Sequence, residues 1–181
     1  MKQLFIIFGV FFCGLIPLQA IETSPTFFYG TMGGGVLSDG HPALSLGLGG
    51  RYRKEHHGVD LSMNAQLSAL FYIYDGSCST KARYLFYPEP QKKNAVYFGL
   101  GGGYGRQWGI FPSGFGGSGI TFSMADWSYL SGEFVMGCEF RRDRAIKPIL
   151  QFGVSQPAVF LRGSGPRNWT PSFTISFGLG F

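Results

Sequence analysis

The 181-residue chain has little charge, no regular glycine repeat and no long hydrophobic run, and each shortage excludes a class of protein. Charged residues make up 14% of the sequence and apolar residues 45%, whereas a disordered chain needs low hydrophobicity and high net charge. The 29 glycines are clustered instead of recurring at every third position, which excludes a collagen-like helix. The longest apolar run has 13 residues, fewer than the roughly 18–20 that cross a bilayer as a helix.

Glycine and phenylalanine are abundant instead, and they point to a β-rich chain of one domain. Each glycine inside a helix costs about 0.5–1 kcal/mol relative to alanine, so 29 of them argue against a helical domain. Together with 19 phenylalanines, they leave a chain whose average hydropathy is near neutral. That average is too polar for helical membrane spans and too apolar for an ordinary soluble surface.

Residues 1–20 have the pattern of an export signal. Lys2 supplies a positive start, an uncharged apolar segment runs from Leu4 to Ile16, and Pro17 precedes a small residue, Ala20, that suits cleavage. A membrane anchor is the alternative, but the apolar segment is too short to span a bilayer. We therefore expect a signal peptide at 1–20 and a single mature domain at 21–181.

Apolar and polar residues alternate along much of the mature chain, as they do in β-strands with one apolar and one polar face. From Val59 to Ile73 every second residue is apolar, and the residues between them are mostly polar. The same period recurs near Leu130–Phe140 and at the C-terminus. About eight such segments are expected, at 26–36, 43–53, 58–73, 79–88, 94–105, 122–140, 146–155 and 172–181.

The connections favour a closed antiparallel up-and-down transmembrane β-barrel of about eight strands. Three connections are short and charged, at 51–57, 88–94 and 141–147, and four others are rich in glycine, proline or serine, with long ones at 106–121 and 156–171. Short turns at one end and longer loops at the other are typical of such barrels. A secreted soluble β-sandwich is the alternative. Small polar inner faces and aromatic residues at segment ends favour the barrel.

The last segment carries the residues of an assembly signal. Its alternate apolar positions, ending on a terminal phenylalanine, are Phe173, Ile175, Phe177, Leu179 and Phe181. This pattern resembles the C-terminal signature of bacterial outer-membrane β-barrel proteins, and the mature length resembles the small eight-stranded group of the OmpA transmembrane domain and OmpX. The resemblance implies an outer-membrane location in a Gram-negative bacterium and recognition by the barrel-assembly machinery.

An eight-stranded barrel is just wide enough for side chains to fill its interior. Arg83 lies on a predicted inner face, where an unpaired charge is costly. We expect it to pair with Glu133 or Asp60, and we expect this structural pair to leave a plugged or very narrow lumen.

The two long loops are candidates for surface binding. They hold arginines beside exposed aromatics, a combination that suits a surface partner or anionic lipopolysaccharide. The candidate residues are Arg106, Trp108, Phe111, Phe115, Arg162, Arg167 and Trp169. Packing of these aromatics at the membrane interface is the alternative. We expect no nucleic-acid partner, because the chain is exported and its basic residues are dispersed over three turns.

His41, Asp75 and Ser77 are the candidates for a catalytic triad, because the predicted topology places all three at the long-loop end. A barrel enzyme that modifies lipid A is the alternative function, but no local motif supports this triad. His56 and His57 have no third metal ligand nearby. The sequence therefore predicts a non-catalytic protein without a cofactor or metal, with a structural or surface-interaction role.

The two cysteines of the mature chain, Cys78 and Cys138, are predicted at opposite ends of the barrel. We expect them to lie too far apart for a disulfide.

Overall fold

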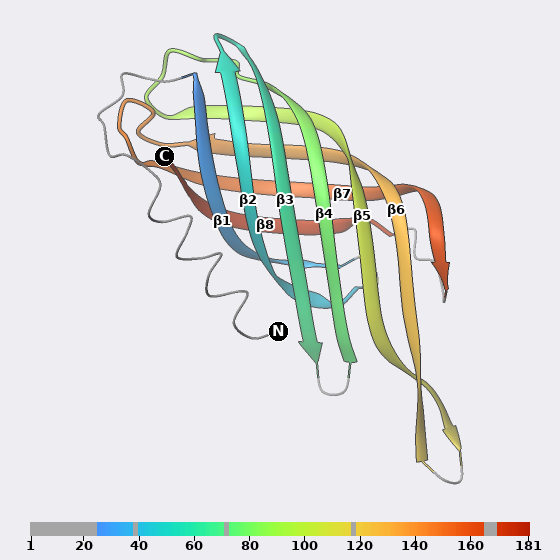
Figure 1. Ribbon diagram of the computed structural model, residues 1–181. Helices are drawn as coiled ribbons and strands as arrows, with labels where there is room; N and C mark the ends of the chain where they lie inside the picture. The colour runs from blue at the N-terminus through green and yellow to red at the C-terminus, as the bar shows by residue number, and fades with distance from the viewer. Residues whose placement is uncertain (1–24, 38–39, 71–72, 117–118, 165–169) are drawn as a thin grey trace.

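The computed structural model describes residues 25–37, 40–70, 73–116, 119–164 and 170–181, and they form a closed eight-stranded antiparallel barrel (Figure 1). The predicted fold class is confirmed, whereas the signal peptide at 1–20 lies outside the described residues. The strands are β1 Thr26–Val36, β2 Pro42–Lys54, β3 His57–Leu70, β4 Ile73–Phe86, β5 Ala95–Gly116, β6 Gly119–Glu139, β7 Lys147–Ser164 and β8 Ser172–Gly180. Within these ranges, no helix has the length and hydropathy of a membrane span.

Each strand pairs with its neighbour in the sequence, and β8 pairs with β1 to close the sheet. Closure rules out the sandwich, because a sandwich has two separate sheets. The stagger of the barrel can be measured by starting at Arg106 on β5 and moving, strand by strand, to the directly opposed residue. The path passes through β4, β3, β2, β1, β8, β7 and β6 and returns to β5 at Val96. This offset of ten residues is the stagger that accompanies strand tilt in a closed barrel.

The two faces of the sheet differ as the alternation predicts. On β3, Leu61 and Met63 are exposed on the outside, whereas Asp60 and Ser62 are buried inside. Every strand contributes large apolar side chains to the outer surface, as Phe28 and Met32 do on β1. The barrel therefore has a continuous apolar exterior and a polar interior.

The expected loop at 106–121 is wrong, because this region is an extended hairpin. Strand β5 continues to Gly116 and β6 begins at Gly119, and their pairing persists through a register shift beside Pro112. Figure 1 shows this ribbon passing beyond the ends of the other strands. The loop at 156–171 is likewise shorter than expected, because β7 runs to Ser164. Glycine, proline and serine favour loops by composition, but antiparallel strands accommodate glycine and proline at edges and bulges.

The aromatics at strand ends do not all face outward, as an interfacial girdle requires. Phe28, Tyr84 and Phe86 are exposed on the outside, but Phe27 and Tyr29 are buried inside the barrel. Tyr87, Trp127 and Tyr129 are buried as well. The reason is the strand period: of three consecutive aromatics, the middle one faces opposite to its neighbours.

Inward tyrosines lie over glycines on the adjacent strand. There are three such pairs: Tyr29 with Gly49, Tyr129 with Gly105 and Tyr97 with Gly137. A Cβ atom added at any of these glycines would lie 2.5 Å from an atom of the opposed tyrosine, a distance that real Cβ atoms do not show. In a narrow lumen, the glycine makes room for the ring, and the ring covers the bare backbone.

Candidate functional site

A fully buried arginine is the centre of the barrel interior near the short turns. The Arg51 guanidinium lies 2.8 Å from the Asp60 carboxylate and 2.7 Å from that of Glu139. Its Cζ also lies 4.4 Å from the centre of the Tyr97 ring. Burying a charge without partners is costly, so the two carboxylates and the ring together make this burial tolerable.

Asp60 connects Arg51 to a second buried arginine. Arg83, a predicted lumen residue, donates to Asp60 at 2.9 Å and also to Ser62. Tyr29 donates to the same carboxylate at 2.7 Å. Of the two partners proposed for Arg83, the structure brings Asp60 into contact.

The third predicted lumen residue has a different partner. Glu133 accepts from Lys81 at 2.9 Å and from Ser131 at 2.9 Å. Lys81 lies on β4, two residues before Arg83, and so shares its inward face. The alternation of β4 therefore contained the signal for this lysine, which sequence reasoning missed.

Arg51 lies in the strand predicted at 43–53, and the charged connection predicted at 51–57 begins too early. Strand β2 continues to Lys54, and the turn consists only of Glu55 and His56, with Glu55 at a φ of 52°. Arg51 and Arg53 keep the inward parity of β2, which the buried Ser45 marks. Charge alone suggested a turn, although the period of the strand continued through it.

Three further cations surround Glu139 at the short-turn rim. Arg53 donates to it at 2.7 Å, and Arg142 lies 3.4 Å from it. Lys147 at the start of β7 is 6% exposed and lies 5.3 Å from the centre of the Phe27 ring. Burial, together with repulsion from Arg53, lowers the pKa of Arg142, which is in the turn after β6.

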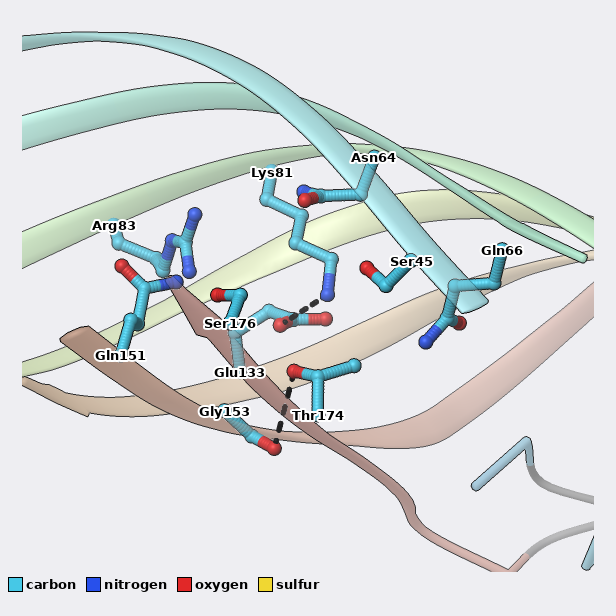
Figure 2. Close-up of a pocket in the computed structure, with 10 residues that line it drawn as sticks. All are labelled: Ser45, Asn64, Gln66, Lys81, Arg83, Glu133, Gln151, Gly153, Thr174 and Ser176. Carbon is cyan, nitrogen blue, oxygen red and sulfur yellow. Dashed lines mark hydrogen bonds and ion pairs between the residues drawn. The ribbon is translucent and has the colours of Figure 1, made fainter. Parts of the chain in front are cut away.

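A small polar cavity lies in the middle of the lumen, between Lys81, Arg83, Glu133 and Gln151 (Figure 2). Its volume of about 20 Å³ suits a water molecule, which needs roughly 10–15 Å³. Figure 2 shows the Lys81 side chain reaching across to Glu133. Buried nitrogens of Gln66 and Arg83 have no hydrogen-bond partner here among the described residues, so ordered water fits the polarity of this cavity.

The outer hairpin carries part of the predicted binding surface. Arg106 on β5 donates two hydrogen bonds to Asp126 on β6, at 2.9 and 2.6 Å. Asp126 lies within the predicted segment 122–140, and it meets Arg106 because β5 continues through Arg106 instead of ending at 105. These hydrogen bonds from Arg106 hold the pKa of the exposed Asp126 below its usual value.

Of the other candidate binding residues, some are described by the structure and some are not. The side chain of Trp108 is 41% exposed and covers Gly76 of the adjacent strand. Arg162 is exposed on β7, and its carbonyl oxygen accepts from Ser128 at 3.5 Å. The side chains of Phe111 and Phe115 and the whole of Arg167 and Trp169 lie outside the described residues.

The proposed triad is only partly assembled. His41 Nδ1 lies 2.5 Å from Asp75 Oδ2, and the Asp75 side chain is fully buried. Ser77, however, donates to Gln66 at 3.1 Å. A nucleophile must contact its base. The hydrogen bond seen for Ser77 goes to the lumen wall instead. Among the described residues, no group of three or more His, Cys, Asp or Glu side chains could hold a metal ion.

The C-terminal strand has the predicted faces. The apolar residues of the assembly pattern are exposed on the outside, whereas Ser176, Gly178 and Gly180 are buried between them. Cys78 and Cys138 are both free.

The comparisons with known proteins identify the fold. No family model and no curated protein matches the chain. Among solved structures, neisserial surface protein A matches with a TM-score of 0.63 at 11% identity, covering 86% of this chain and 94% of that one. Ail, the attachment invasion locus protein of Yersinia pestis, has a TM-score of 0.53 at 16% identity, with 86% and 95% covered.

A third match is the N-terminal β-barrel domain of Pseudomonas aeruginosa OprF, with a TM-score of 0.53 at 10% identity and coverage of 87% and 97%. These identities are low, so the likeness concerns the fold alone. The chain has the fold of the small eight-stranded barrels of bacterial outer membranes.

Proposed function

We propose that the protein is a small, non-catalytic barrel of the bacterial outer membrane, with a closed lumen and a surface-interaction role. The observation that carries the proposal is the exterior: apolar side chains such as Leu46, Leu61 and Phe177 are exposed on neighbouring strands all round the barrel. Soluble monomers rarely expose more than a few hundred Å² of continuous apolar surface. A lipid environment removes this exposure without leaving an unpaired strand edge.

The orientation follows from the lengths of the connections. Short turns lie at the periplasmic end of such barrels and longer loops outside, so the β5–β6 hairpin faces outward from the cell. Residues 1–20 direct export, and the outward pattern ending at Phe181 is recognised by the barrel-assembly machinery. The first test is location: the protein should be extracted from the outer membrane only by detergent and should show a heat-dependent gel shift. Release into buffer would overturn the proposal.

The closed lumen is supported by ion pairs inside it. Arg83 on β4 pairs with Asp60 on the adjacent strand β3, and Lys81 on β4 reaches past β5 to Glu133 on β6. Single-channel recording in planar bilayers is the direct test, and we expect no stable conductance. Large, long-lived pores would contradict a closed lumen while leaving the membrane location intact.

The surface role is supported by the exposed aromatic and basic side chains near the outer hairpin. Trp108 lies on β5, which extends beyond β4 at this end, and Arg162 lies on β7, which extends beyond β8. We propose lipopolysaccharide as the ligand, because its acidic groups suit arginine and its acyl chains suit tryptophan. Ail has been solved with a sulfated heparin analogue, which shows that one barrel of this fold binds a polyanion.

The test compares the unfolding midpoint of the protein in phospholipid nanodiscs with and without lipopolysaccharide. We expect lipopolysaccharide to raise the midpoint of the wild type. Replacing Arg162 by glutamine should weaken the interaction about fivefold, since one basic residue at an anionic surface contributes about 1 kcal/mol. Arg144→Gln, in an exposed turn at the other end, is the matched control. Equal effects of the two substitutions would exclude this surface.

A further inference from the structure

In the part of the barrel interior between the central cavity and the short turns, cationic side chains outnumber the carboxylates that they face. Five cationic side chains gather around Asp60 and Glu139, which leaves an excess of three positive charges. The cations are Arg51, Arg53, Arg83, Arg142 and Lys147. Tyr29 and Tyr87 only donate hydrogen bonds to the two carboxylates, so they add no negative charge. An uncompensated positive charge in a partly buried place favours an anion.

Lys147 carries the positive charge that is least compensated. Lys147 is 6% exposed, yet within the part of the chain that the structure describes it forms no hydrogen bond or ion pair. Its ammonium group lies 5.3 Å from the centre of the Phe27 ring. The terminal residue Phe181 follows Gly180, which is opposite Lys147, but its carboxyl group forms no ion pair with the lysine. Burying an ammonium group is costly unless an oxygen atom accepts a hydrogen bond from it, so Lys147 favours an anion beside it.

The neighbouring arginines have donors to spare. Arg53 uses Nη1 for Glu139, and Arg142 uses Nη1 for the carbonyl oxygen of Pro90. Both guanidinium groups lie against the Tyr87 ring, at 5.9 and 5.2 Å from its centre, so the ring holds them at one place on the rim. The Nε atom of Arg142 is buried and lies 3.4 Å from Glu139 Oε2 without a hydrogen bond to it, which leaves Nη2 of Arg142 as the donor to spare.

We infer that Arg53, Arg142 and Lys147, the rim cations, form a binding site for a phosphate-type oxyanion at the short-turn mouth of the barrel. Two guanidinium groups and one ammonium group offer several directed donors, which suits a tetrahedral oxyanion better than a halide. The anion has two sources with the same chemistry: free phosphate, or the phosphate of a lipid headgroup in the adjacent leaflet. The site is separate from the outer hairpin, which lies at the other end of the barrel (Figure 1).

The experiment titrates inorganic phosphate into the whole folded protein in a phosphate-free, non-ionic detergent, by calorimetry at constant ionic strength. We expect saturable binding, with chloride at the same concentration giving none. Lys147→Met and Arg142→Gln should each weaken binding about tenfold or more, because a hydrogen bond to a charged group contributes about 1.5–3 kcal/mol. Lys147→Arg should retain it.

The matched controls are Lys93→Met and Arg144→Gln, which change exposed cations of the same rim. They should bind phosphate like the wild type. The variants can be checked for folding by their heat-dependent gel shift, and Lys147→Met should fold well because it removes an unpaired buried charge. Absence of saturable binding by the wild type, or equal weakening in site and control variants, would overturn the inference.

A second arm distinguishes the sources of the phosphate. The protein is placed in vesicles of phosphatidylglycerol, and the titration with inorganic phosphate is repeated. If lipid headgroups fill the site, the added phosphate gives no signal in vesicles although it binds in detergent. If the site takes free phosphate, binding persists in both. Either result supports a site for phosphate-type anions, given binding in detergent.

Discussion

Arg51 and Glu139 are 88 residues apart in the sequence and form a 2.7 Å ion pair with neither side chain exposed. The pair joins β2 to β6 directly across the interior, because these strands are not neighbours in the sheet. It can form only once the strands from β2 to β6 have paired and the sheet has curved round. Backbone pairing between adjacent strands therefore brings the two residues into reach, and their contact then ties opposite walls together.

Replacing Arg51 by methionine should cost about 3–5 kcal/mol of unfolding free energy, because it leaves buried carboxylates without their partner. Asp60 would keep Arg83, and Glu139 would keep Arg53, so the loss falls toward the lower end of this range. Urea unfolding in detergent, followed by tryptophan fluorescence, measures it. Arg144→Met, at an exposed turn position, should change stability by less than about 0.5 kcal/mol. Equal losses would show that the buried network contributes nothing special.

Replacing Gly105 by alanine should destabilise the barrel by about 1–3 kcal/mol, the usual cost of overpacking. The new methyl group would lie 2.5 Å from the Tyr129 ring, which is held inside the wall. Gly132→Ala on the paired strand is the control, since no atom lies within 4 Å of its added Cβ. The urea midpoints of the two variants measure the difference. If both fall alike, the strand itself requires glycine, and the tyrosine has no part in the effect.

Asp126 should titrate at a lower pH in the folded wild type than in Arg106→Gln. Its folded-state pKa lies below the ordinary value of 3.8 because Arg106 donates hydrogen bonds to the carboxylate. A depressed folded-state pKa means that the stabilisation is complete above the unfolded value and is lost as the pH falls through the folded one. Carboxyl NMR titration measures both values, with Arg141→Gln at the opposite end as control. An unchanged pKa in Arg106→Gln would contradict the pair.

Replacing His41 by alanine should leave the mass spectrum of lipid A unchanged in cells that produce the protein. Although His41 contacts Asp75, the hydroxyl group of Ser77 is directed to Gln66. The appropriate comparison is the spectrum of cells lacking the protein altogether. A mass change that depends on the protein and disappears in His41→Ala would establish the lipid-modifying alternative.

Much of the fold could be predicted from the sequence because it depends on local period. The alternation from Val59 onward and at the C-terminus gave the strands and their outer faces. The extension of β5 and β6 could not be predicted in this way, since Gly114 and Pro112 are loop residues by composition. Only the backbone pairing of the two strands shows that they continue the hairpin.

The charged interior was predictable in part. Parity placed Arg83 and Asp60 on inner faces, and the structure brings them together. The inward role of Arg51 was not predicted because its charge suggested a turn, and that of Lys147 because it begins a strand. Which inward charges meet depends on barrel closure and stagger, and neither quantity is visible in a single sequence.

The tyrosine–glycine pairs also bear on how the sheet finds its alignment. A shift of one residue between β5 and β6 would turn Tyr129 to the outside, and a shift of two would set it against a residue other than Gly105. Tyr97 and Gly137 restrict the register of the two strands in the same way at the other end of that hairpin. Misaligned hairpins are thus penalised before the last strand closes the barrel, so these pairs serve folding fidelity as much as final packing.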